Sequence, residues 1–91
     1  MSFLDSLLTG LGKVAEAAGQ GLLIIEWRDT LRNEGIQMLQ VKIRNFLRTA
    51  SEEDKNRIKK LLKDQVNNYD LPSDDRKVMT QVHEIYIDQL G

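Results

Sequence analysis

The chain has 91 residues, of which 41% are hydrophobic and 30% charged, and its 13 basic and 14 acidic residues nearly cancel. This composition is that of a single globular domain, and it excludes a disordered chain or one whose overall charge attracts nucleic acid or anionic membrane. Cysteine is absent, which excludes disulfides, thiolate metal sites and thiol nucleophiles and favours the cytoplasm over secretion.

An amphipathic helix followed by a glycine hinge is predicted over residues 1–21, with the hinge at Gly19-Gln20-Gly21. We expect this segment to be retained and not to span a membrane, because it lacks the basic start of a signal peptide and its charges interrupt any long apolar run. It can dock on its own bundle, on a partner protein or on a membrane surface. Its apolar residues recur at helical spacing: Leu4, Leu7, Leu8, Leu11, Val14, Ala15 and Ala18.

A long second helix is predicted over residues 22–50, which contain no proline. A straight helix of this length measures about 42 Å, more than the diameter of about 30 Å expected for a compact chain of this size, so it favours a dimer. We favour a straight helix buried on two sides over a bend at Asn33-Glu34-Gly35. Its apolar residues form two stripes: Ile24, Trp27, Leu31, Met38 and Phe46 on one, and Ile36, Leu39, Ile43, Leu47 and Ala50 on the other.

The third and fourth helices are predicted over residues 51–69 and 73–90, where Ser51 and Ser73 are capping serines followed by acidic residues. The short connection between them predicts an antiparallel hairpin. The whole chain, residues 1–91, is therefore predicted to be one all-α domain, a small bundle of about four helices with a long second helix and a C-terminal antiparallel helical hairpin.

Catalytic chemistry has few residues to use in this chain. His83 is the only histidine, and the serines at the two caps are explained by capping. A metal site at His83, Glu84 and Asp88 is disfavoured, because these residues have neither the Glu-x-x-His nor the His-Glu-x-x-His spacing. We therefore predict a protein that is not an enzyme, with no cofactor, no metal site and no small-molecule substrate.

A run of eight basic residues lies between Lys42 and Lys63, opposed by three acidic ones. It is a candidate anion-binding segment, although an ordinary solvated face, paired with the acidic last helix of the same or another copy, explains it as well. Nucleic acid is the less favoured ligand, because no aromatic residue is interleaved for base stacking. The candidate anion-binding residues are Arg48, Lys55, Lys59, Lys60 and Lys63.

The function that these features favour is a non-enzymatic protein–protein interaction or assembly module, self-associating as a homodimer or binding another protein through apolar helix faces. The first alternative is a membrane-surface protein that uses the N-terminal helix, although Lys13 is the only basic residue there. The second is a nucleic-acid accessory protein that uses the Lys42–Lys63 segment. The residues predicted at the partner interface are Phe3, Leu4, Leu7, Leu8, Leu11 and Trp27.

Overall fold

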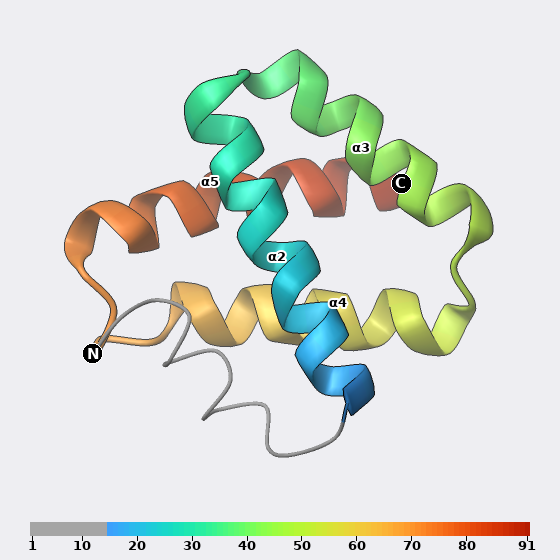
Figure 1. Cartoon of the computed structure of the whole chain (residues 1–91), viewed down its shortest axis with the longest axis horizontal. Coiled ribbons are helices and arrows are strands. Elements are labelled where there is room, and N and C mark those ends of the chain that lie inside the picture. The colour runs from blue at the N-terminus through green and yellow to red at the C-terminus, as the bar shows by residue number, and fades with distance from the viewer. Residues whose placement is uncertain (1–14) are drawn as a thin grey trace.

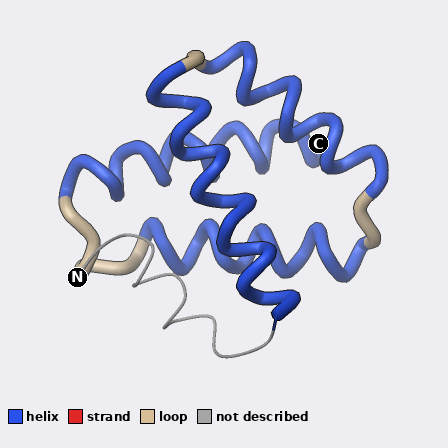
Figure 2. The backbone as a smooth tube through the Cα atoms, viewed as in Figure 1, coloured by secondary structure: helices blue, strands red, loops and turns tan. Residues whose placement is uncertain are grey.

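The computed structural model describes residues 15–91, and this part of the chain is built from four helices without a strand. They are α2 (Ala15–Asn33), α3 (Ile36–Thr49), α4 (Glu52–Val66) and α5 (Ser73–Leu90), shown in Figure 1. Short loops at residues 34–35, 50–51 and 67–72 join them, as Figure 2 shows. The predicted all-helical, bundle-like fold is confirmed. None of these four helices is both long and apolar enough to cross a membrane.

The predicted long second helix is wrong, because the chain breaks between α2 and α3. Gly35 has φ 97° and ψ 177°, a backbone conformation that is essentially restricted to glycine. The amides of Glu34 and Gly35 both donate to the carbonyl of Thr30, at 2.8 and 3.0 Å, and end α2. The longest dimension of the folded molecule is 32 Å, whereas an unbroken helix would reach about 42 Å. Folding back at Gly35 brings Ile24 and Trp27 of α2 and Leu39 and Ile43 of α3 into one core.

The predicted hinge at Gly19-Gln20-Gly21 is also wrong, because α2 runs through all three residues. Each glycine in a helix costs about 1 kcal/mol relative to alanine, an amount that packing of the same helix can offset. Gly21 is buried, and Ile24 and Trp27 on the following turns are in the core. Tertiary contacts therefore keep the helix intact across the glycines.

The core lies where α2 packs against α4 and α5, with α3 packed on α2 and α5. Figure 1 shows α2 lying across the other two. The Trp27 ring is at the centre, 5.5 Å from the ring of Phe46 in an edge-to-face arrangement and 5.7 Å from that of Tyr86. The buried hydrophobic residues are Ile24, Trp27, Leu39, Ile43, Ile58, Leu61, Leu62, Leu71, Met79, Val82 and Tyr86.

The ends of α4 and α5 follow local rules. Ser51 caps α4 as predicted: its hydroxyl accepts a hydrogen bond of 3.1 Å from the amide of Asp54. Ser73 is instead the first residue of α5, and Pro72 occupies the cap position. The two helices pack on each other, and the Tyr86 hydroxyl donates to the carbonyl of Lys55 at 2.7 Å.

Candidate interaction surfaces

The residues predicted at the partner interface divide into two groups. The first five, Phe3, Leu4, Leu7, Leu8 and Leu11, lie outside the described residues and stay predictions. Trp27, in contrast, is only 1% exposed. Its ring packs against Phe46 and Tyr86, so Trp27 stabilises the folded chain and is not available at the surface.

The outer face of α3, made of Met38 and Val41, is an apolar surface that the sequence pattern did not predict. These two side chains are 42% and 43% exposed and lie about one helical turn apart. Leu39 and Ile43, on the inner side of the same helix, are 0% exposed. Ile36, the first residue of α3, is also exposed. Two apolar side chains are therefore exposed on the outer side of α3, while its inner apolar side is covered within the described part of the chain.

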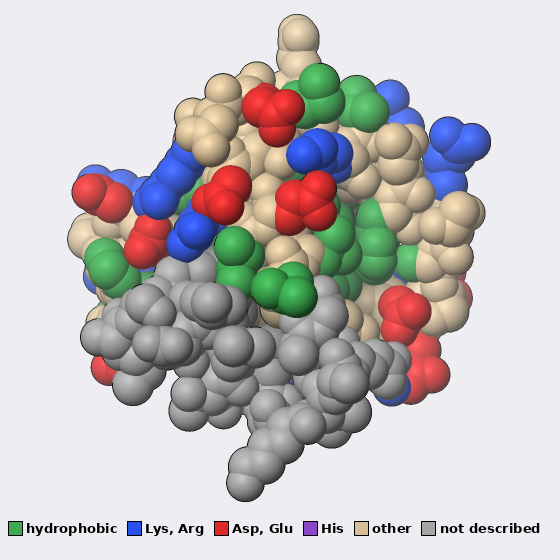
Figure 3. Space-filling view, viewed as in Figure 1, with side chains coloured by type: hydrophobic (Ala, Val, Ile, Leu, Met, Phe, Trp, Pro, Cys, Tyr) green, Lys and Arg blue, Asp and Glu red, His purple; other side chains and the backbone are tan. Residues whose placement is uncertain are grey.

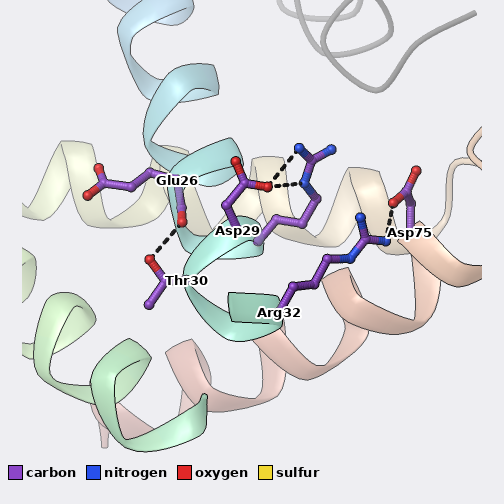
Figure 4. Close-up of polar contacts among 6 residues, drawn as sticks. Glu26, Asp29, Thr30, Arg32 and Asp75 are labelled. Carbon is purple, nitrogen blue, oxygen red and sulfur yellow. Dashed lines mark hydrogen bonds and ion pairs between the residues drawn. The ribbon is translucent and has the colours of Figure 1, made fainter. Parts of the chain in front are cut away.

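A polar network links α2 to α3 around Thr30, which is 2% exposed. The Thr30 hydroxyl donates to the carbonyl of Glu26 at 2.8 Å, as Figure 4 shows, and accepts from the Lys42 ammonium at 2.9 Å. The same ammonium lies 3.4 Å from a carboxylate oxygen of Glu26 and 3.5 Å from one of Glu34. Lys42 therefore ties α3 to Glu26 and Thr30 of α2 and to Glu34 in the loop that follows it.

A second set of polar contacts connects α2 to α5. Arg32, near the end of α2, forms an ion pair with Asp75 in the first turn of α5 (Figure 4). Within α2, the guanidinium of Arg28 donates to one carboxylate oxygen of Asp29, at 2.8 and 3.0 Å. Figure 3 shows acidic and basic side chains intermixed on this face, with hydrophobic side chains in separate groups around them. These contacts position α2 on the bundle and neutralise most of its surface charge.

The residues predicted to bind anions lie on two helices: Arg48 on α3, and Lys55, Lys59, Lys60 and Lys63 on α4. Lys55 is already paired, because its ammonium lies 3.2 Å from a carboxylate oxygen of Glu52. The other three lysines are exposed and form no ion pair with any described residue. The structure thus reduces the available cationic charge of α4 to Lys59, Lys60 and Lys63.

His83 of α5 lies within electrostatic range of this part of α4. Partial burial lowers the pKa of its imidazole below 6.5, and the positive charges of Lys59 and Lys63 lower it further, against a smaller opposing effect of Glu84. An imidazole in this setting favours its neutral form and adds no fixed positive charge at neutral pH. Within the described residues, no group of three or more histidine, aspartate or glutamate side chains could hold a metal ion.

Comparison of the chain with protein-family models, with curated proteins and with solved structures finds no match.

Proposed function

We propose that the protein is a non-enzymatic helical module that binds protein partners and self-associates, with a homodimer as the principal state. The observation that supports this most directly is the outer face of α3. The inner apolar side of α3 is covered by its own chain, and exposed apolar side chains that lie together, as Met38 and Val41 do, are a feature of protein–protein contacts. Met38 and Val41 would then be buried by a second copy, while Leu39 and Ile43 stay in the core of their own chain.

The apolar stripe of residues 1–14 belongs to the same proposal. One helical face alone buries less than the roughly 800 Å² per partner of a stable protein interface, so a second contact is needed. Phe3, Leu4, Leu7, Leu8 and Leu11 can supply it. We also propose that α4 and α5 form an antiparallel hairpin that serves as the scaffold for α3, and that the protein acts in the cytoplasm, as its cysteine-free composition favours.

Light scattering tests the proposal. The wild type should show a mass that rises with concentration from the 10.5 kDa of one chain toward twice that value. The Met38→Glu/Val41→Glu variant should stay monomeric, because two carboxylates on the outer face of α3 would have to be desolvated in the dimer. The matched control is Asn56→Glu/Gln81→Glu, which adds the same charge at exposed positions of α4 and α5 and should behave as the wild type. A wild type that is monomeric at every concentration would overturn the proposal.

Deleting residues 1–14 tests the N-terminal contribution without cutting into α2, which begins at Ala15. A loss of dimer mass supports the interface role. The membrane-surface alternative is separated in the same experiment, because it predicts that this deletion removes co-sedimentation with anionic liposomes while the mass in solution does not change.

A second candidate function is anion binding by α4, and it is favoured by one observation: Lys59, Lys60 and Lys63 are exposed without ion pairs among the described residues. If it holds, retention on heparin falls with increasing salt, and the Lys60→Glu variant elutes earlier than the wild type. Lys77→Glu, an exposed lysine of α5, is the control. Equal loss of retention in the control would show that only overall charge matters.

A further inference from the structure

The connection between α2 and α3 has the properties of an exchange hinge. Only Glu34 and Gly35 separate the two helices. The single proline of the chain is Pro72, so nothing in residues 15–49 forbids one continuous helix except the conformation of Gly35. Short hinge loops of this kind favour the exchange of a terminal element between copies, because changing a few backbone angles redirects the whole element.

The contacts that hold α2 in place do not depend on the chain passing through this hinge. The Trp27 ring packs on Tyr86 of α5, and Arg32 pairs with Asp75 of the same helix. Thr30 accepts from Lys42 of α3 at 2.9 Å. All of these join α2 to residues on the far side of Gly35. An α2 helix from a second copy could therefore make every one of them with the same geometry.

We propose that two copies exchange α2 by opening at Glu34 and Gly35, so that α2 and α3 become one continuous helix in each chain. The α2 helix of each copy then occupies the surface that α3, α4 and α5 of the other copy present. This inference rests on the proposed self-association, but it names a different contact from the outer face of α3: the surface that α2 of the second copy occupies. The arrangement is symmetric and closed, because each chain gives and receives the same element. It preserves the core and replaces the bend at Gly35 by helical backbone.

Two substitutions at the hinge shift the exchange in opposite directions. Gly35→Ala disfavours the bend, because alanine does not adopt φ 97° readily, and favours the continuous helix, where alanine is the best helix former. Ile36→Pro preserves the bend. Proline is favoured at the first residue of a helix, and it requires an extended residue before it, which the ψ of 177° at Gly35 provides. In a continuous helix the same proline would clash with the carbonyl of Arg32. Ile36 is 52% exposed, so its loss leaves the core intact.

The experiment refolds each protein at high concentration and measures its mass by light scattering, with far-UV circular dichroism to confirm helical content. We expect the mass of Gly35→Ala to double from 10.5 kDa, that of Ile36→Pro to stay at the monomer value, and that of the wild type to lie between them. Exchanged dimers should persist for hours after dilution, because release of α2 requires unfolding. Dimers formed by surface contact should dissociate at once.

The outcomes separate the exchange from the proposed function. If Ile36→Pro dimerises as strongly as the wild type, the exchange is overturned and surface assembly stands. If only Gly35→Ala dimerises, both the exchange and the self-association of the wild type are overturned. If Gly35→Ala lacks helical content, the masses of the wild type and Ile36→Pro are compared instead. Loss of the dimer in Ile36→Pro then supports the exchange, and a wild type that stays monomeric after refolding overturns it. A Gly35→Ala dimer that dissociates when Met38 and Val41 are replaced by glutamate also overturns it.

Discussion

Replacing Tyr86 with phenylalanine removes one oxygen atom from the centre of the fold. The Tyr86 side chain is fully buried, its ring lies 5.7 Å from that of Trp27, and its hydroxyl donates to the carbonyl of Lys55 at 2.7 Å. Phenylalanine keeps the ring contacts and deletes only the hydrogen bond. A buried hydrogen bond of this kind contributes about 1 kcal/mol net. At pH 7 we therefore expect the free energy of unfolding of Tyr86→Phe to be lower than that of the wild type by about 1 kcal/mol.

The difference should disappear at high pH. Burial, with a smaller effect of the negative charge of Glu52, raises the pKa of Tyr86 from 10.0 to about 12. The unfolded phenol therefore loses its proton near pH 10 and the folded one near pH 12, so the stability that the neutral phenol contributes is complete below pH 10 and is lost as the pH rises to 12. That shift corresponds to at most about 3 kcal/mol, of which about half is lost at pH 11. This loss is enough to offset the roughly 1 kcal/mol that the hydrogen bond contributes at pH 7.

The assay is urea unfolding at pH 7, 9 and 11, monitored by the fluorescence of Trp27, the only tryptophan. Both proteins carry Tyr69→Phe, so that Tyr86 is the only tyrosine of the reference protein. We expect the reference to be more stable by about 1 kcal/mol at pH 7 and 9, and the two to be equal at pH 11. A difference that is the same at pH 7 and pH 11 would refute the reasoning, because lysine titration affects both proteins alike.

Three other changes test separate parts of the structure. Trp27→Ala should lower the free energy of unfolding by about 3–5 kcal/mol, because it leaves a cavity at the ring cluster; a thermal melt within a few degrees of the wild type would contradict this. Thr30→Val should cost about 1–2 kcal/mol in urea unfolding, since it removes the hydroxyl that Lys42 contacts at 2.9 Å, and an unchanged midpoint would count against the network. The pKa of His83, followed by NMR, should lie below 6.5 and rise in Lys59→Gln, because burial lowers it first and Lys59 second. Since protonation of His83 then favours the unfolded chain, stability should fall as the pH drops below 6.5.

Local signals predicted the start of α4 well and the fate of the glycines poorly. Ser51 followed by three acidic residues is a cap that needs no information from elsewhere, and the bond from Asp54 to its hydroxyl confirms it. Gly21 and Gly35 are the same residue with opposite outcomes: α2 continues through the first and ends at the second. Whether a glycine ends a helix depends on what the chain gains by folding back, which is a property of the whole core.

The same break explains why the outer face of α3 was not predicted. The prediction of one helix over residues 22–50 carried the helical periodicity through residues 33–35. It therefore placed Met38 on the same stripe as Trp27, facing the core. The bend at Gly35 resets the rotation of α3 relative to α2, so Met38 lies on the exposed side while Leu39 and Ile43 face inward. Periodicity alone identifies the two apolar stripes, but only the bend decides which one is covered.

The position of α2 across α4 and α5 sets an order of events in folding kinetics. The pair α4 and α5 is joined by residues 67–72 and forms over a short loop, whereas the contact between Arg32 and Asp75 closes 43 residues. Closing a longer segment of chain costs more conformational entropy and is slower. We therefore expect α4 and α5 to associate first and α2 to dock last. In stopped-flow refolding, most of the helical signal should then develop before the fluorescence of Trp27 changes. In that interval the chain has an unfilled core and an undocked α2. The longer this intermediate lives, and the higher the protein concentration, the more chains meet a second copy before their own α2 docks.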